Sequence, residues 1–250
     1  MLAPEPVPPS TAIARQDTHL DSLAERLRDL PVRAVIAPMI VGDPLPTMPP
    51  DNLRFVLDLG LVRETTDGAV EVANPIYREI IARQLTVSVR ASWPALEITW
   101  RGAAGPPDWT RLLDAFVVFW LQHGEALLGS ATYPEAAPHL VLMAFLQRVV
   151  NGGGRVEREY AVGTRRLDLC VEYAGRRLGV EVKTWRDTDK TRDPADEGLS
   201  QLAGYLARLG TTYGWLVLFD QRAAPPPLPT RIQRTRVDTA DGRTIDVLRL

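Results

Sequence analysis

The chain has 250 residues, of which 45% are hydrophobic and 24% are charged, as expected for a folded protein with a sizeable core. Its 29 basic and 31 acidic residues give a formal net charge of −2, so any contact with nucleic acid needs a local basic patch. A single cysteine excludes an intrachain disulfide and favours the cytoplasm, and the apolar runs are too short to cross a bilayer.

The first part of the chain predicts a small helical unit. Residues 1–16 are rich in proline and lack the basic start and apolar stretch of a signal peptide, so we expect them to be disordered. Apolar periodicity and capping residues predict helices over residues 17–29, 31–40 and 51–60. Asp51 is the expected N-cap of the third helix, and a hairpin is expected over 61–73. Three helices followed by a hairpin is the order of a winged-helix domain, which we expect over 17–84, although its acidic third helix suits phosphate binding poorly.

Residues 85–130 are predicted to form a connector that contains one helix. The start of this segment is rich in Trp, Pro and Gly, and helical periodicity sets in from Trp109 to about Gly124. The apolar side of the helix is expected to hold Leu112, Leu113, Phe116, Trp120 and Leu121.

The last part of the chain, residues 131–250, predicts an α/β domain. A helix that is apolar nearly all round is expected over 135–150, which suggests burial against a sheet. A strand is expected over about 155–162, and two more strands within 165–185. An amphipathic helix over about 194–209 and an apolar strand over 214–220 follow. Two final strands are expected to turn at Ala240–Gly242.

Two neighbouring strands in this domain carry acids and a lysine on one face. Because side chains alternate along a strand, Glu181 and Lys183 share a face, and Asp168 and Cys170 share a face opposite Leu167. If the strands form a hairpin, Asp168 lies close to Glu181 and Lys183.

The lysine at this position stands out against the composition. Only two of the 29 basic residues are lysines, Lys183 and Lys190, and the others are arginines. A guanidinium is bulkier than an amine and does not lose its proton easily. The sequence therefore indicates that position 183 requires an amine.

Asp168, a gap of twelve residues and then Glu181-Val182-Lys183 resemble the motif of the PD-(D/E)XK phosphodiesterase superfamily, which includes restriction endonucleases and repair nucleases. The resemblance implies a restriction-endonuclease-like αβββαβ core and metal-dependent hydrolysis of DNA. It implies that Asp168, Glu181 and the Val182 carbonyl hold Mg²⁺ or Mn²⁺, and that Lys183 assists the water nucleophile. Leu167 stands where the superfamily often has a proline.

The same resemblance implies two further catalytic residues on the flanking helices. In this superfamily the first helix often adds an acid, and Glu135 is the matching residue here. The helix after the motif often adds a glutamine, which matches Gln201. A carboxylate near a helix N-terminus also favours the helix dipole, so Glu135 has a second explanation.

A narrower resemblance covers about Thr18 to Leu250. Segments such as NLRFVLDLGLVRE, GVEVKTWRD and EGLSQLAGYLARLG are similar to the C-terminal half of bacterial AAA-type ATPases that end in a PD-(D/E)XK domain. The chain has no GxxxxGK[ST] loop, so we expect no ATP site in it. The resemblance implies an ATPase or another protein as a possible partner, besides DNA.

Two alternatives to the nuclease hypothesis stay open at this point. Asp168, Glu181 and Lys183 could form a cross-strand salt-bridge ladder on a solvated face, although this chain would be expected to use arginine there. The domain could also be an inactive nuclease fold that docks onto a protein partner. The three histidines lack metal-ligand spacing and are expected to be structural, and packing is favoured for Cys170.

Overall fold

The computed structural model describes residues 25–41, 45–66, 68–73, 81, 100, 106–129, 136–150, 153–162, 165–187 and 193–250. The chain divides into two compact units, Met1–Ser88 with Thr132–Ala136 and Val89–Ala131 with Ala137–Leu250. No helix within the described ranges combines the length and the apolar character that crossing a membrane requires.

The first unit contains helices and a short hairpin. Its elements are α2 (Leu30–Val41), α3 (Pro50–Asp58), β1 (Val62–Glu64) and β2 (Val70–Val72). The strands pair antiparallel, and Arg63 bonds to Glu71 across them at 2.8 Å. Pro49 holds the N-cap position of α3, not Asp51 as expected, because a proline starts the helix and Asp51 falls in its first turn. The helix expected over 17–29 lies mostly outside the described residues.

The second unit is built on a six-stranded mixed sheet in the order β3-β4-β5-β6-β8-β7. Its strands are β3 (Gly154–Val162), β4 (Arg165–Tyr173), β5 (Arg176–Trp185), β6 (Tyr213–Asp220), β7 (Gln233–Asp238) and β8 (Thr244–Arg249). The expected hairpin between β4 and β5 is confirmed, since they pair antiparallel. Strands β5, β6 and β8 run parallel, so their carboxyl ends meet at one edge of the sheet.

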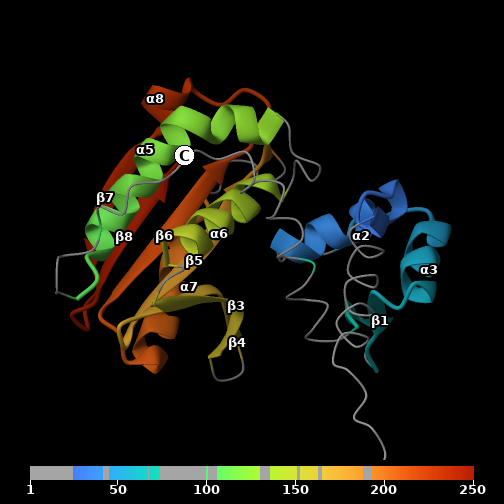
Figure 1. Cartoon of the computed structure of the whole chain (residues 1–250), viewed down its shortest axis with the longest axis horizontal. Coiled ribbons are helices and arrows are strands. Elements are labelled where there is room, and N and C mark those ends of the chain that lie inside the picture. The colour runs from blue at the N-terminus through green and yellow to red at the C-terminus, as the bar shows by residue number, and fades with distance from the viewer. Residues whose placement is uncertain are drawn as a thin grey trace, which may run out of the picture. The chain divides into compact units, whose positions relative to one another are not determined.

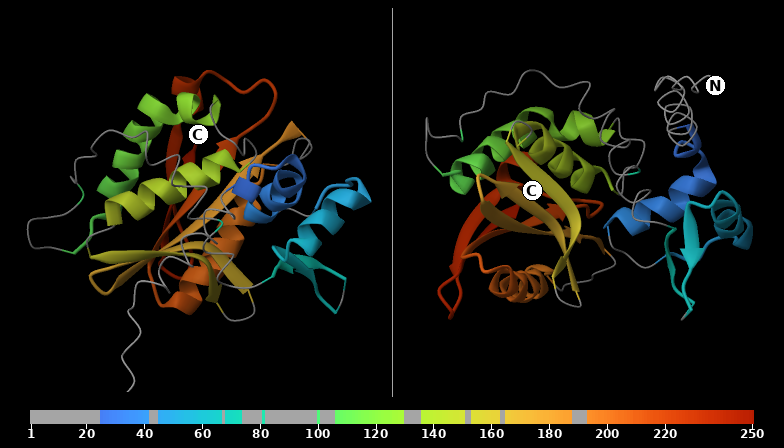
Figure 2. Two further views of the ribbon diagram at one scale, coloured as in Figure 1. Left: turned by 45° about the vertical axis from the view of Figure 1, so that its right-hand side comes forward. Right: turned by 60° about the horizontal axis from the view of Figure 1, so that its bottom comes forward.

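Helices cover both faces of this sheet. Figure 2 shows α5 (Trp109–Gly129) and α6 (Ala137–Val150) on one face and α7 (Ala195–Leu209) on the other. Helix α6 is buried along nearly its whole circumference, as its apolar sequence predicts. The predicted α/β class, a mixed sheet flanked by helices, is therefore confirmed at this level.

Helix α5, expected within a connector, belongs to the second unit. Its Phe116 ring lies 5.1 Å from the ring of Phe145 on α6, and Trp120 lies 5.0 Å from Phe219 on β6. Leu121, expected on the apolar side, is 47% exposed, and Phe119 is buried instead. Phe119 follows Phe116 by three residues and so lies on the same helix face, whereas Leu121 follows by five.

Two features of the C-terminal part were not predicted. The proline-rich link contains a short helix, α8 (Leu228–Arg231), which follows Pro227. The last strand, β8, lies between β6 and β7, so the final hairpin joins the sheet through its second strand (Figure 1). Such parallel pairing between distant segments leaves no local signal in the sequence, unlike the hairpin turn itself.

Candidate functional site

The candidate site lies where β4 and β5 part. The two strands pair from Tyr173↔Arg176 to Leu169↔Val180, and beyond Leu169 the start of β4 pairs only with β3. Asp168 is the first residue past this point, and its Oδ2 accepts a hydrogen bond of 2.8 Å from the backbone N–H of Val182. The carboxylate thus satisfies a donor of β5 that no longer has a main-chain partner on β4.

The divergence also changes the side on which Leu167 packs. Strict alternation predicted Leu167 and Cys170 on opposite faces, yet both belong to the buried cluster beneath α7. The expectation of strict alternation fails between these two residues, where the pairing of β4 with β5 ends. Asp168 lies in the part of β4 that no longer pairs with β5.

Glu181 is the most buried acid of the site. Its side chain is 5% exposed, and within the described part of the chain its Oε2 has no hydrogen-bond donor. Burial and the neighbouring Asp168 carboxylate raise the pKa of Glu181 to about 8, while Lys183 and the Asp168 backbone N–H act in the opposite direction. A buried carboxylate oxygen without a donor is a position that a cation would satisfy.

Lys183 lies between Glu181 and helix α7. Its Nζ is 3.3 Å from Glu181 Oε1 and donates a hydrogen bond of 2.6 Å to Gln201 Oε1. Gln201 Nε2 in turn donates to Glu197 Oε1 at 3.0 Å, one turn earlier on the same helix. This chain of contacts fixes the ammonium group, and the Lys183 side chain as a whole is 23% exposed.

Gly198 provides the space in which Lys183 reaches α7. A Cβ added at Gly198 would lie 2.6 Å from Leu216 Cδ1 and 3.3 Å from Lys183 Cγ. Both neighbours are side chains of the sheet, and Leu216 is fully buried, so a larger residue would force the Leu216 side chain or the helix to shift. Sequence reasoning missed Gly198 and Glu197, although the spacing of Glu197 and Gln201 by four residues on a helix was a usable signal.

The structure thus brings together Asp168, Glu181, Lys183 and Gln201 of the predicted site residues. Glu135, the fifth, lies outside the described residues. Among the residues that are described, no group of three or more His, Cys, Asp or Glu side chains is arranged to hold a metal ion. Asp168 and Glu181 supply two carboxylates, and Mg²⁺ is commonly bound in proteins by one or two carboxylates together with waters. The donor set therefore fits a hard divalent cation.

Other titratable residues of this unit are packed in the core. Cys170 is buried, and burial raises the pKa of its thiol to about 11, so it is no candidate nucleophile. Burial, with Arg158, Arg186 and Lys183 nearby, lowers the pKa of His139 to about 3. Tyr205, one turn beyond Gln201, is buried in the cluster beneath α7.

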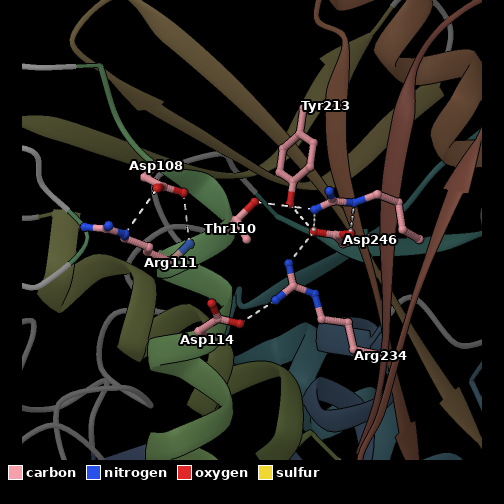
Figure 3. Close-up of polar contacts among 8 residues, drawn as sticks. Asp108, Thr110, Arg111, Asp114, Tyr213, Arg234 and Asp246 are labelled. Atoms are coloured by element: carbon pink, nitrogen blue, oxygen red, sulfur yellow. Dashed lines mark hydrogen bonds and ion pairs between the residues drawn. The ribbon is translucent and has the colours of Figure 1, made fainter.

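A second polar cluster, around Asp246 on β8, lies on the opposite face of the sheet (Figure 3). The Asp246 side chain is 1% exposed and accepts hydrogen bonds from Arg236 at 2.8 and 3.1 Å, from Arg234 at 2.6 Å and from the Tyr213 hydroxyl. Although burial acts in the opposite direction, these donors lower the pKa of Asp246 to about 2. Arg234 also pairs with Asp114 on α5, so the cluster ties α5 to the sheet.

No protein-family model matches the chain, and a search of curated proteins gave no significant match.

Proposed function

We propose that this protein is a metal-dependent phosphodiesterase that hydrolyses nucleic acid, with DNA as its substrate. The observation that carries the proposal is the meeting of Asp168, Glu181 and Lys183 at the point where β4 and β5 part. A solvated salt-bridge ladder does not explain this arrangement, because Glu181 is buried and one of its oxygens has no donor among the described residues.

The fold assignment is part of the proposal. The element order α6-β3-β4-β5-α7-β6 supports a restriction-endonuclease-like αβββαβ core. The helices and hairpin of the first unit support a winged-helix-like domain, which we propose as a surface for DNA or for a protein partner such as an ATPase.

In this proposal Asp168, Glu181 and the Val182 carbonyl hold Mg²⁺ or Mn²⁺. When bound, such a cation neutralises charge on the phosphate and lowers the pKa of a coordinated water. The Val182 N–H holds the Asp168 carboxylate in place through its 2.8 Å hydrogen bond. Because Glu181 has a raised pKa, its carboxyl group must release a proton before it can serve as a ligand.

Lys183 then acts on the substrate. Its ammonium group is fixed by Gln201 and Glu181, and its side chain is partly exposed, so it can donate to the attacking water or to a phosphate oxygen. Gln201 is a positioning residue for this amine, and Glu197 orients the Gln201 amide. Charge that develops on the phosphate oxygens during attack is stabilised by the ammonium group.

The test separates metal binding from the role of the lysine. Mn²⁺ and Mg²⁺ are titrated into the wild type, Asp168→Asn and Lys183→Met by calorimetry, and each protein is incubated with single- and double-stranded DNA and RNA. We expect Asp168→Asn to lose metal binding and cleavage, and Lys183→Met to lose cleavage but keep metal binding. Asp238→Asn, an exposed acid on β7, is the matched control and should retain both.

The opposite result would select a different function. If the wild type binds neither metal and cleaves none of these substrates, the nuclease proposal is rejected. The domain would then be a catalytically inactive module, and its partner would be sought among proteins.

A further inference from the structure

A pocket opens at the carboxyl edge of the sheet, on the face that α7 covers. Its volume is about 360 Å³, within the range of cavities that hold one small molecule. The walls are formed by the ends of β5, β6 and β8 and by the connection that contains α8. In open α/β sheets, ligands bind preferentially at the carboxyl ends of parallel strands.

The pocket adjoins the candidate site. Trp185, which lines it, follows Lys183 by two residues on the same strand face, a separation of about 7 Å. Leu218, another wall residue, is the register partner of Lys183 on β6. A strand of nucleic acid that reaches Lys183 can therefore extend into this pocket.

Most of the charges on the pocket walls are already paired. Arg222 binds Asp220 at 2.8 and 2.5 Å, and Arg249 binds Asp193 at 3.3 and 2.6 Å. Burial raises the pKa of each aspartate, but the hydrogen bonds from its arginine outweigh this and lower it, so both acids are ionised at neutral pH. These two pairs therefore contribute no net charge.

Arg231 is different, because its guanidinium binds backbone carbonyls. It donates to Pro226 O at 3.2 Å and to Asp220 O at 3.3 Å, and it forms no ion pair within the described residues. Its positive charge acts on the Asp220 carboxylate, but that acid already pairs with Arg222, so the pocket wall keeps a net positive charge. An arginine in this state suits a phosphate, which its planar donors can bind in a bidentate manner.

The wall also contains flat groups. The Arg222 guanidinium lies 3.9 Å from the centre of the Trp185 ring, and Arg249 lies 6.0 Å from it. Contact with the Trp185 ring and pairing with Asp220 hold the Arg222 guanidinium in place, and pairing with Asp193 holds that of Arg249. Nucleic-acid bases stack on aromatic rings and on guanidinium planes, so these groups suit a nucleotide better than a bare anion.

We propose that this pocket binds one nucleotide through its phosphate group, with Arg231 as the anchoring cation. The role of the pocket rests on the proposed phosphodiesterase function, since the nucleotide held there lies next to the one that is cleaved. The ligand is either part of a nucleic-acid strand or a free mononucleotide, and both carry the phosphate group that Arg231 would bind.

Binding is measured by calorimetry on the full chain in EDTA, so that neither metal nor cleavage is needed. The probes are deoxyadenosine 5′-monophosphate and a short single-stranded oligodeoxynucleotide. Arg231→Gln removes the charge, Arg231→Lys keeps it, and Arg208→Gln, on the exposed end of α7, is the control with the same charge change. We expect Arg231→Gln to weaken mononucleotide binding about tenfold or more. Arg231→Lys should weaken it less, because it keeps the charge but loses the planar donors, and Arg208→Gln should stay within about threefold of the wild type.

Each outcome decides the proposal. If Arg231→Gln loses affinity for both the mononucleotide and the oligonucleotide, the phosphate that the pocket binds belongs to a strand. If it loses affinity for the mononucleotide alone, the ligand of the pocket is a free nucleotide. If the wild type binds neither probe, or if Arg208→Gln loses as much affinity as Arg231→Gln, the pocket proposal is overturned. Binding that depends on Arg231 without any cleavage would reject the phosphodiesterase function and leave the pocket standing.

Discussion

Glu181 combines burial, a neighbouring acid and a neighbouring amine within a few ångströms. Its Oε1 lies 3.3 Å from Lys183 Nζ, while its Oε2 has no donor in the described part of the chain. Because burial and Asp168 raise its pKa to about 8, Glu181 is largely protonated at neutral pH when no cation is bound. Metal affinity should therefore rise with pH up to about this value.

The raised pKa has a consequence for stability that Glu181→Gln tests. The folded state holds the Glu181 proton up to about pH 8, whereas the unfolded chain releases it near 4.5, so the free energy of unfolding falls as the pH rises between these values. The neutral glutamine removes this fall. We expect the variant to match the wild type below this range and to be more stable above it.

The measurement is urea unfolding in EDTA across this pH range. Parallel curves for the two proteins would contradict the prediction, because they would mean that Glu181 ionises alike in the folded and unfolded states.

Single residues of the site were predicted from sequence to different degrees. Glu181 and Lys183 followed from strand alternation and from the scarcity of lysine, and Asp168 from the motif that the two strands share. Gly198 could not be predicted, because its importance depends on which residues of the sheet α7 meets.

Among the elements, α7 determines how closely Lys183 is held. Gly198→Ala should destabilise the protein by about 1–3 kcal/mol, since the new Cβ would overlap the buried Leu216 side chain and force it or the helix to shift. A shift of the helix should also separate Gln201 from Lys183 and lower the proposed nuclease activity. Chemical unfolding and cleavage assays provide the two measurements.

The same helix offers a matched control. A Cβ added at Gly204 has no neighbour within 4 Å, so Gly204→Ala should raise stability by about 0.5–1 kcal/mol through helix propensity. Equal effects at both glycines would show that α7 does not contact the sheet as described.

Helix α5 depends on a buried carboxylate. Asp246→Asn leaves Arg234 and Arg236 without their shared acid, and we expect it to lower the free energy of unfolding by about 2 kcal/mol. Asp114→Asn, whose acid is 59% exposed, should cost no more than about 0.5 kcal/mol. Urea unfolding compares the two, and similar losses would contradict a buried role for Asp246.

At the level of elements, the sequence predicted local order better than pairing. The run of helices and strands from α6 to β6 was expected because each has its own apolar period. The insertion of β8 beside β6 was not, since it depends on parallel contacts between segments about thirty residues apart. The same insertion brings Arg249 into the pocket, which is why the pocket was not foreseen.

For the whole molecule, the net charge of −2 limits how the proposed nucleic-acid substrate could bind. Attraction must come from a few cations near the site, so the affinity for a single strand should depend only moderately on salt. We expect log K to fall with log salt concentration with a slope of about −2, equivalent to about three phosphate contacts. Fluorescence anisotropy of a labelled oligonucleotide in EDTA measures it, and a slope of about −6 would indicate a large basic surface elsewhere.

The fixed ammonium group of Lys183 also makes the chain suitable for selective isotope labelling. Because only two side chains in the sequence carry a primary amine, reductive methylation with isotope-labelled formaldehyde would mark Lys183 and Lys190 and no other side chain. Besides the signal of the α-amino group, one of the two lysine methyl signals would then come from a group 3.3 Å from Glu181 and 2.6 Å from Gln201. The scarcity of lysine thus gives this protein a built-in spectroscopic reporter within its own candidate site.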